Sequence, residues 1–308
     1  MMRAALALLL PLAATAFHAP TRRPRLTMAR PSTNLAEPTT PTREVLADGL
    51  YAADRYVSTL RYFVPQDAQV AFEQAWASRE SSLGNAKGFR YFQMGKRSAD
   101  FMGPPLPDDE PNYLAYAVWD SKEDFEAFDE ELDLVRAQLG KGVAEAQGLG
   151  GAPANYDGLF CLALPPSEAC VAPDASGWRT PPEDPAPDAG EKKRLPREAF
   201  VASNRFGIKP GFEKQFEAMW AKRDSSLADL PGFKNFALLR REGDIDDGNT
   251  YVSYTTWQDA QAFNHWRGSE NFKRSHSSSG GNEESPYAKM PKVVTWKCFL
   301  VISCPEGA

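Results

Sequence analysis

The imidazoles of this chain are few, and their positions limit the metal and acid–base chemistry that it can perform. The sequence holds three histidines, His18, His265 and His276. His276 follows Phe272 by four residues, so both side chains share one face of a short helix predicted over residues 270–276. A histidine beside an aromatic ring on an inward helix face can bind a flat apolar cofactor and ligate its iron. The other interpretation is a partly exposed histidine near a helix end, where the helix dipole favours it.

An indole and an amide are further candidates for a binding site. Trp266 follows Phe263 by three residues in a predicted short helix, a spacing that ordinary core packing also produces. His265 is adjacent to Trp266, points elsewhere, and is assigned a surface or structural role. Asn204 stands in a predicted strand among apolar and aromatic neighbours, although asparagine is disfavoured in strands. It is either an inward amide that faces a cavity and needs hydrogen-bond partners, or an outward, solvated side chain.

Composition and charge exclude several classes of function. Hydrophobic residues make up 42% of the 308 residues and charged residues 25%, the balance of a soluble globular protein. Residues 1–36 contain five arginines and no acid, so removing them leaves 35 − 5 = 30 basic residues against 41 acidic ones, a net charge of −11. Such a protein should bind neither nucleic acid nor anionic membranes. No apolar run after the N-terminal segment is long enough to span a bilayer.

The cysteines argue against a metal cluster. The four are Cys161, Cys170, Cys298 and Cys304, and none forms a CxxC pair, which speaks against a zinc or iron–sulfur site. In a reducing compartment we expect free thiols.

The N-terminal segment, residues 1–48, is predicted to be a targeting sequence. Arg3, an apolar run over residues 4–12 and small residues before Phe17 form a signal peptide with a cleavage site. A phenylalanine directly after such a site resembles the bipartite presequence of algae with secondary, red-lineage plastids. The following stretch has four arginines and no acid before Glu37, which suits a transit peptide. We therefore expect the protein in a plastid, with the secretory pathway as the alternative.

The rest of the chain contains one unit twice. Aromatic and other positions of the first copy recur at an offset of 144 without a gap, and then at an offset of 138 after a longer, proline-rich loop over residues 102–111. Matching pairs include Tyr56 with Phe200, Phe72 with Phe216, Trp76 with Trp220, Phe89 with Phe233, Tyr113 with Tyr251, Trp119 with Trp257, and Phe125 with Phe263. So many aromatic matches in register indicate an internal duplication.

Each copy predicts a ferredoxin-like βαββαβ unit. In the second copy the expected elements are strands over 199–206, 233–240, 250–257 and 293–302, and helices over 211–227, 259–267 and 270–276. The order gives an antiparallel sheet with its helices on one face, so the other face must be covered. Two copies can cover each other sheet to sheet. We therefore predict an α+β fold in which two ferredoxin-like repeats form a dimeric α+β barrel within one chain.

The domain boundaries follow from this organisation. We place the first copy at residues 49–164, a Pro-rich, acidic linker at 165–197 and the second copy at 198–308.

The second copy resembles the antibiotic-biosynthesis-monooxygenase (ABM) superfamily, and within it is similar to the IsdG-type heme-degrading monooxygenases. The resemblance covers about residues 199–303 and rests on three segments: Ala202 to Phe206, Leu230 to Phe233, and Thr256 to His276. That family uses an asparagine on the first strand, a tryptophan on the second helix region and a histidine that ligates heme iron. These roles fall on Asn204, Trp266 and His276.

The resemblance implies a heme-degrading monooxygenase that opens the porphyrin ring with dioxygen and an external electron donor and releases iron. It implies His276 as the iron ligand, Asn204 as a hydrogen-bond donor on the other side and Trp266 as bulk that distorts the porphyrin. Phe272, Trp220 and Met219 are expected to line the pocket. The chain has no Rossmann or flavin signature, so the electrons must come from another molecule.

The first copy departs from the pattern at each of these positions. Leu60, Phe128 and Gln138 stand where the second copy has Asn204, Trp266 and His276, so the first copy is expected to close the barrel without binding heme. Three alternatives stay open: a cofactor-independent monooxygenase acting on a quinone-like aromatic, a non-catalytic heme or tetrapyrrole-binding protein, and a barrel without a ligand.

Overall fold

The computed structural model describes residues 44–78, 83, 86–98, 111–128, 152–163, 197–222, 227–243, 247–270, 272 and 284–303. All of them belong to one compact unit, residues 43–308. The predicted targeting sequence lies almost wholly outside the described residues, and so do most of the linker and the histidine at position 276. Within the described residues, no helix is both long and apolar enough to cross a bilayer.

The two copies contain the same strands and α-helices in the same order. The first comprises β1 (Arg55–Tyr62), η1 (Gln66–Ala68), α1 (Gln69–Ser78), β2 (Phe89–Arg97), β3 (Tyr113–Trp119), a helix over 122–128 and β4 (Ala152–Ala163). The second comprises β5 (Ala199–Phe206), α4 (Glu213–Ala221), η3 (Leu227–Asp229), β6 (Phe233–Arg241), β7 (Tyr251–Trp257), α5 (Ala260–Arg267) and β8 (Lys292–Ser303). The 3-10 helix η1 precedes α1 in the first copy, whereas the 3-10 helix η3 follows α4 in the second.

One predicted helix is shorter than expected at both ends, and α4 stops at Ala221, with Lys222 as its C-cap residue, rather than at Leu227. The spacing predicted a helix from Gly211, but α4 begins at Glu213 because Gly211 has a φ of +87° and Phe212 is the non-helical N-cap residue. A left-handed residue cannot continue a right-handed helix.

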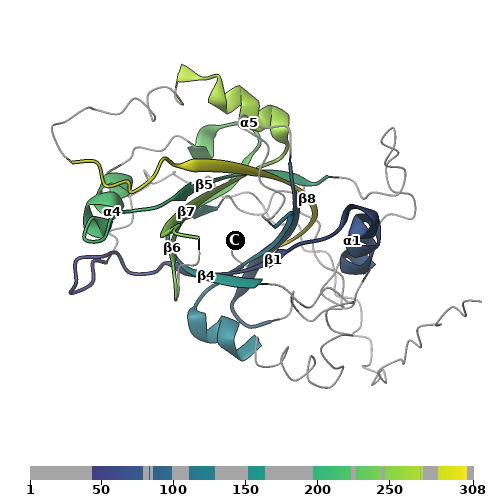
Figure 1. Ribbon diagram of the computed structural model, residues 1–308, viewed down its shortest axis with the longest axis horizontal. Coiled ribbons are helices and arrows are strands. Elements are labelled where there is room, and N and C mark those ends of the chain that lie inside the picture. Colours follow the sequence, from purple (N-terminus) through teal and green to yellow (C-terminus); the bar gives the residue numbers. More distant parts are fainter. Residues whose placement is uncertain are drawn as a thin grey trace, which may run out of the picture. The chain divides into compact units, whose positions relative to one another are not determined.

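The eight strands form a closed antiparallel barrel in the order β1-β3-β2-β8-β5-β7-β6-β4 (Figure 1). Two seams join the copies: β2 pairs with β8, and β4 pairs with β6. The last strand of each copy thus completes its own sheet and also binds the other copy. The barrel of two ferredoxin-like repeats predicted from the sequence is confirmed.

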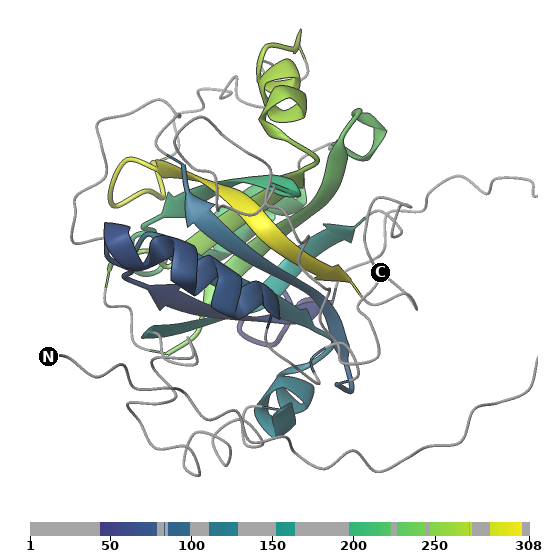
Figure 2. The same cartoon turned by 90° about the vertical axis from the view of Figure 1, so that its right-hand side faces the viewer.

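The period-two alternation of the strands divides the core into an inner and an outer part. Inside the barrel, residues from both copies pack together, including Val57, Tyr116, Val201, Tyr254 and Trp296. On the outside, three clusters lie beneath α1, α4 and α5. The helices therefore cover the outer faces of the sheets; Figure 2 shows α1, in dark blue, across one of them.

Each copy fastens its first helix to its sheet with a buried glutamate. Glu73 on α1 accepts a hydrogen bond from the Tyr113 hydroxyl at 2.8 Å, and the equivalent Glu217 on α4 accepts one from Tyr251 at 2.6 Å. Glu217 is fully buried and also accepts from the backbone N–H of Tyr51 at 2.8 Å. This bond fixes the segment before β1 to the second copy.

A glycine with left-handed backbone brings α5 close to the sheet. Gly232, before β6, has a φ of +79°, and a Cβ placed on it would lie 2.5 Å from the Ala262 Cβ. The helix begins at Ala260, and the side chain of the preceding residue, Asp259, accepts from the Ala262 N–H at 2.8 Å as an N-cap. These two residues set where α5, and with it Trp266, lies on the second copy.

Candidate functional site

The predicted site residues of the second copy that the structure describes lie on α4, on or just after α5, and on the outer face of the sheet between them. Along β5, Val201 points into the barrel, whereas Phe200 packs beneath α5 and Phe206 packs beneath α4. Asn204 shares the facing of these two phenylalanines because side chains of a strand alternate. It therefore lies between the two helix-covered clusters.

Asn204 is neither sealed in the core nor fully solvated. Its side chain is half-buried, and its Nδ2 donates a hydrogen bond to the Ser253 Oγ at 3.2 Å. Ser253 stands directly opposite on β7 and is 1% exposed. The hydrogen bond to Ser253 thus holds the amide in one orientation, while part of the side chain stays accessible beneath the helices. Asn204 therefore has features of both the inward and the outward position that the sequence left open.

Trp266 lies on α5 and forms the edge of the aromatic cluster. Its ring centroid is 5.4 Å from that of Trp257 and 5.8 Å from that of Phe263, so it takes part in core packing. Phe272 meets it edge-on at 4.9 Å with an interplanar angle of 90°. The predicted pair of Trp266 and Phe272 is therefore in direct contact.

Met219 and Trp220 lie on α4, on the other side of Asn204. Both are partly buried against the cluster beneath this helix. Trp220 stacks on Phe236 of β6, with centroids 5.8 Å apart and rings 23° from parallel. Phe236 packs against the clusters of both helices and so connects the two sides of the candidate site.

The histidines are only partly accounted for. His276 lies outside the described residues, so its role as iron ligand stays a prediction. His265 is exposed on α5. Among the described residues, no group of three or more His, Cys, Asp or Glu side chains could hold a metal ion.

A row of small polar residues surrounds Asn204, and the sequence reasoning missed it. Ser253 and Thr255 on β7 and Thr295 on β8 share the outward face of β5, because they pair with Asn204 or Ala202 in the register. All three are at most 5% exposed. We call Asn204, Ser253, Thr255 and Thr295 the polar strip.

The first copy lacks most of this strip. At the positions equivalent to Asn204, Ser253 and Thr255 it has Leu60, Ala115 and Ala117, which pack in the cluster beneath α1. Extending the alignment of the two copies from aromatic to small residues would have revealed the difference. Polarity at buried positions in only one of two duplicated sheets is typical of a functional face, because burial of polar groups opposes folding.

Comparison with known proteins identifies the family. The sequence profile of the antibiotic biosynthesis monooxygenase family matches residues 55–138 and residues 199–278, together more than half of the chain. The chain belongs to this family. The match to both copies also agrees with the duplication seen in the sequence and in the barrel.

Individual relatives refine the comparison. Over 90 residues, the chain is 30% identical to heme oxygenases described as staphylobilin-producing, from two strains of Staphylococcus epidermidis; the match covers 29% of this chain and 85% of the relatives. The structure of a candidate monooxygenase from Fusobacterium nucleatum aligns with 82% of this chain and 96% of its own, at 9% identity and a TM-score of 0.52. That likeness concerns the fold alone.

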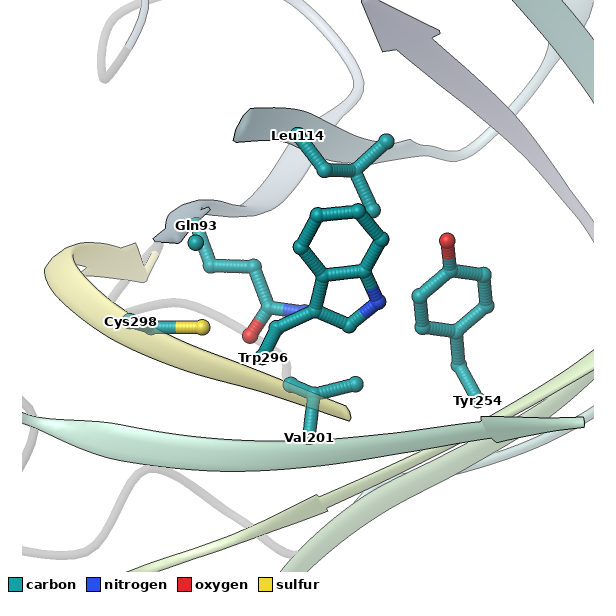
Figure 3. Close-up of a pocket in the computed structure, with 7 residues that line it drawn as sticks. Gln93, Leu114, Val201, Tyr254, Trp296 and Cys298 are labelled. Carbon is teal, nitrogen blue, oxygen red and sulfur yellow. The ribbon is translucent and has the colours of Figure 1, made fainter. Parts of the chain in front are cut away.

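The inside of this ABM barrel is too full for a tetrapyrrole. Tyr116 and Tyr254 meet there with ring centroids 4.7 Å apart, and burial raises the pKa of both hydroxyls well above their ordinary value. A pocket beside Tyr254 has a volume of about 0 Å³ in which a water molecule could fit; it is lined by Gln93, Gly95, Leu114, Val201, Tyr254, Trp296 and Cys298 (Figure 3). Ligand pockets usually measure roughly 300–1,000 Å³. Among the described residues, the outer faces of the sheets are therefore the candidate sites for a large ligand.

Proposed function

We propose that the second copy binds heme on its outer sheet face, between α4 and α5, and degrades it as a monooxygenase. Heme would be the substrate, dioxygen the oxidant and an external donor the source of electrons, with a ring-opened tetrapyrrole and iron as products. The chain's membership of a monooxygenase family and its similarity to heme oxygenases support this choice of chemistry.

The polar strip is the observation that carries the proposal. It places an amide and several hydroxyls between two aromatic clusters, one of which includes Trp266. A flat apolar molecule with a polar centre needs such a surface: aromatic walls to bury its rings and few, fixed polar groups to orient it. Since the first copy has Leu60 and alanines there, we expect one heme per chain.

The residues of this face would have distinct tasks. Ser253 holds the Asn204 amide, whose nitrogen carries a second hydrogen that can be donated to the ligand. Trp266 would contact one face of the porphyrin with its indole and help to hold it. His276 would ligate the iron as a neutral imidazole. Bound heme supplies the oxidising chemistry when dioxygen and electrons arrive.

Titration of the full chain with hemin tests the proposal. We expect a shifted Soret band that saturates at about one equivalent, and its loss in His276→Ala. Asn204→Ala should still bind hemin but degrade it about two to three powers of ten more slowly, the usual effect of a lost positioned donor. Leu60→Ala, at the equivalent position of the first copy, is the matched control and should behave as wild type.

The same assay separates the enzyme from its alternatives. With a reductant and air, the wild-type Soret band should bleach and chelatable ferrous iron should appear. Tight binding without bleaching under any suitable donor would favour a heme-binding protein. Absence of hemin binding would refute the proposal and favour a cofactor-independent monooxygenase.

We also propose that the protein acts in a plastid of a red-lineage alga. The support is the sequence of residues 1–48 alone. A fusion of these residues to a fluorescent protein should enter the plastid of a diatom, whereas Phe17→Ala should hold it outside. Secretion of the unaltered fusion would contradict the proposal.

A further inference from the structure

One hydrogen bond of the first copy has lost its acceptor in the second. In the first copy, the Trp119 indole Nε1–H donates to the Ser58 Oγ at 3.1 Å. By the two repeat offsets, Trp257 is the equivalent of Trp119, and Ala202 is the equivalent of Ser58. The second copy has therefore kept the donor and replaced the acceptor by a methyl group.

The indole rings lie in the same place in both copies. Their ring contacts agree within a few tenths of an ångström and a few degrees: Trp119–Phe89 at 5.6 Å and 73° with Trp257–Phe233 at 5.7 Å and 79°, and Trp119–Phe125 at 5.9 Å and 61° with Trp257–Phe263 at 6.1 Å and 64°. The Trp257 N–H therefore points toward Ala202 as the Trp119 N–H points toward Ser58.

Two buried polar groups beside Ala202 find no partner among the described residues. They are the Nε1 of Trp257, a side chain that is 0% exposed, and the Oγ1 of Thr295, which is 2% exposed. Thr295 pairs directly with Ala202 across β5 and β8, so it faces the same way. Native proteins pair nearly all buried polar groups, and an exception at a functional face calls for a ligand.

The chemistry of these groups defines what they can bind. An indole N–H only donates, and a hydroxyl can donate as well, so both suit one acceptor oxygen. Lys297 is the next outward residue of β8 and adds positive charge on this side, which favours a carboxylate. Ala202 is also the outward residue next to Asn204, and Trp266 packs on Trp257, so the groups adjoin the proposed heme face.

We propose that Trp257 and Thr295 form a polar anchor for a carboxylate oxygen of the molecule seated between α4 and α5. In heme this oxygen belongs to a propionate side chain. The use of hemin as the probe rests on the proposed function, whereas the anchor itself does not. The alanine at position 202 keeps the donor available: a serine there would satisfy it within the protein. The second copy would thus have exchanged a stabilising internal bond for a bond to its ligand.

The substitution Ala202→Ser tests the anchor by restoring the bond of the first copy. We expect it to raise the melting temperature of the full chain and to weaken hemin binding about tenfold, the effect of one lost hydrogen bond to a charged group. Ser58→Ala is the matched control: it should lower the melting temperature and leave hemin affinity unchanged. Thr295→Val, which keeps the shape without the hydroxyl, should weaken hemin binding without lowering the melting temperature.

An NMR measurement on the free protein keeps the test independent of heme. The indole N–H signal of Trp257, assigned with Trp257→Phe, should move downfield in Ala202→Ser and on titration with acetate, a carboxylate probe. If wild type binds no hemin, the proposed function fails by itself, and the acetate titration then decides on the anchor.

Three results would overturn the anchor. If Ala202→Ser binds hemin with the affinity of wild type, the Trp257 donor plays no part in binding. If the Trp257 N–H signal moves neither in Ala202→Ser nor on titration with acetate, the donor is already paired, and ordered water is all that binds there. Equal weakening of hemin binding by Ser58→Ala would point to a general loss of folding stability.

Discussion

Replacement of Gly232 by alanine should destabilise the second copy, because α5 lies too close to this position to leave room for a Cβ. The glycine has a φ of +79°, and an added Cβ would lie 2.5 Å from the Ala262 Cβ. Gly243 offers a matched control, because its φ is +71° and nothing lies within 4 Å of its virtual Cβ. Both variants place an alanine at a left-handed φ, but only Gly232→Ala brings the new Cβ against Ala262.

The magnitudes follow from these two contributions. A left-handed alanine costs about 1–2 kcal/mol, which is the expected loss in the free energy of unfolding of Gly243→Ala. Overpacking against Ala262 adds about 1–3 kcal/mol in Gly232→Ala, for a total of about 2–5 kcal/mol. A change of 1 kcal/mol shifts the melting temperature of a domain of this size by about 2–4 °C, so the shifts can be resolved.

Denaturant unfolding followed by circular dichroism measures these losses, and a double variant isolates the collision. Ala262→Gly removes the opposing methyl at a helix-propensity cost of about 1 kcal/mol. Combined with Gly232→Ala, it should destabilise the fold by about 1–3 kcal/mol less than the sum of the single changes. Additive losses, or equal losses in Gly232→Ala and Gly243→Ala, would refute the argument that the contact with α5 matters.

Three further predictions concern buried polar groups. Glu217→Gln should destabilise the fold by about 1–3 kcal/mol, because it removes the buried carboxylate 3.1 Å from the Arg240 guanidinium, while Asp157 still accepts from that guanidinium at 2.9 Å; a loss below about 0.5 kcal/mol in thermal unfolding would contradict this. Tyr251→Phe, which removes only the hydroxyl bonded to Glu217, should cost about 1.5–3 kcal/mol, with the exposed Glu270→Gln as a neutral control. Burial raises the pKa of the Cys298 thiol to about 12. Above the ordinary pKa of about 8.5 the thiol ionises in the unfolded chain but stays protonated in the folded one. Its contribution to the free energy of unfolding is therefore complete below about pH 8.5 and is lost between about pH 8.5 and 12. Cys298→Ala should flatten that alkaline decline in pH-dependent denaturant unfolding, and an unchanged slope would show that another group causes it.

The sequence by itself determined the duplication and the barrel. Aromatic residues such as Trp119 and Trp257 recur in register, because each copy must build the same core beneath the same helices. The alternation of the strands and the spacing of the helices predicted the βαββαβ order, and the open sheet face required a second layer. Local patterns suffice for these features because they depend on burial and on residues close in the chain.

Only the tertiary structure decided which way the site residues face and what surrounds them. Sequence left Asn204 between an inward and an outward position, since strand alternation fixes neighbours but not the side that the helices cover. The register with β7 and β8 brought Ser253 and Thr295 next to it from 49 and 91 residues along the chain, a proximity that no local spacing records. The lack of a partner for the Trp257 donor among the described residues likewise became visible only once the two folded copies could be compared atom by atom, because hydrogen-bond pairing is a property of packing.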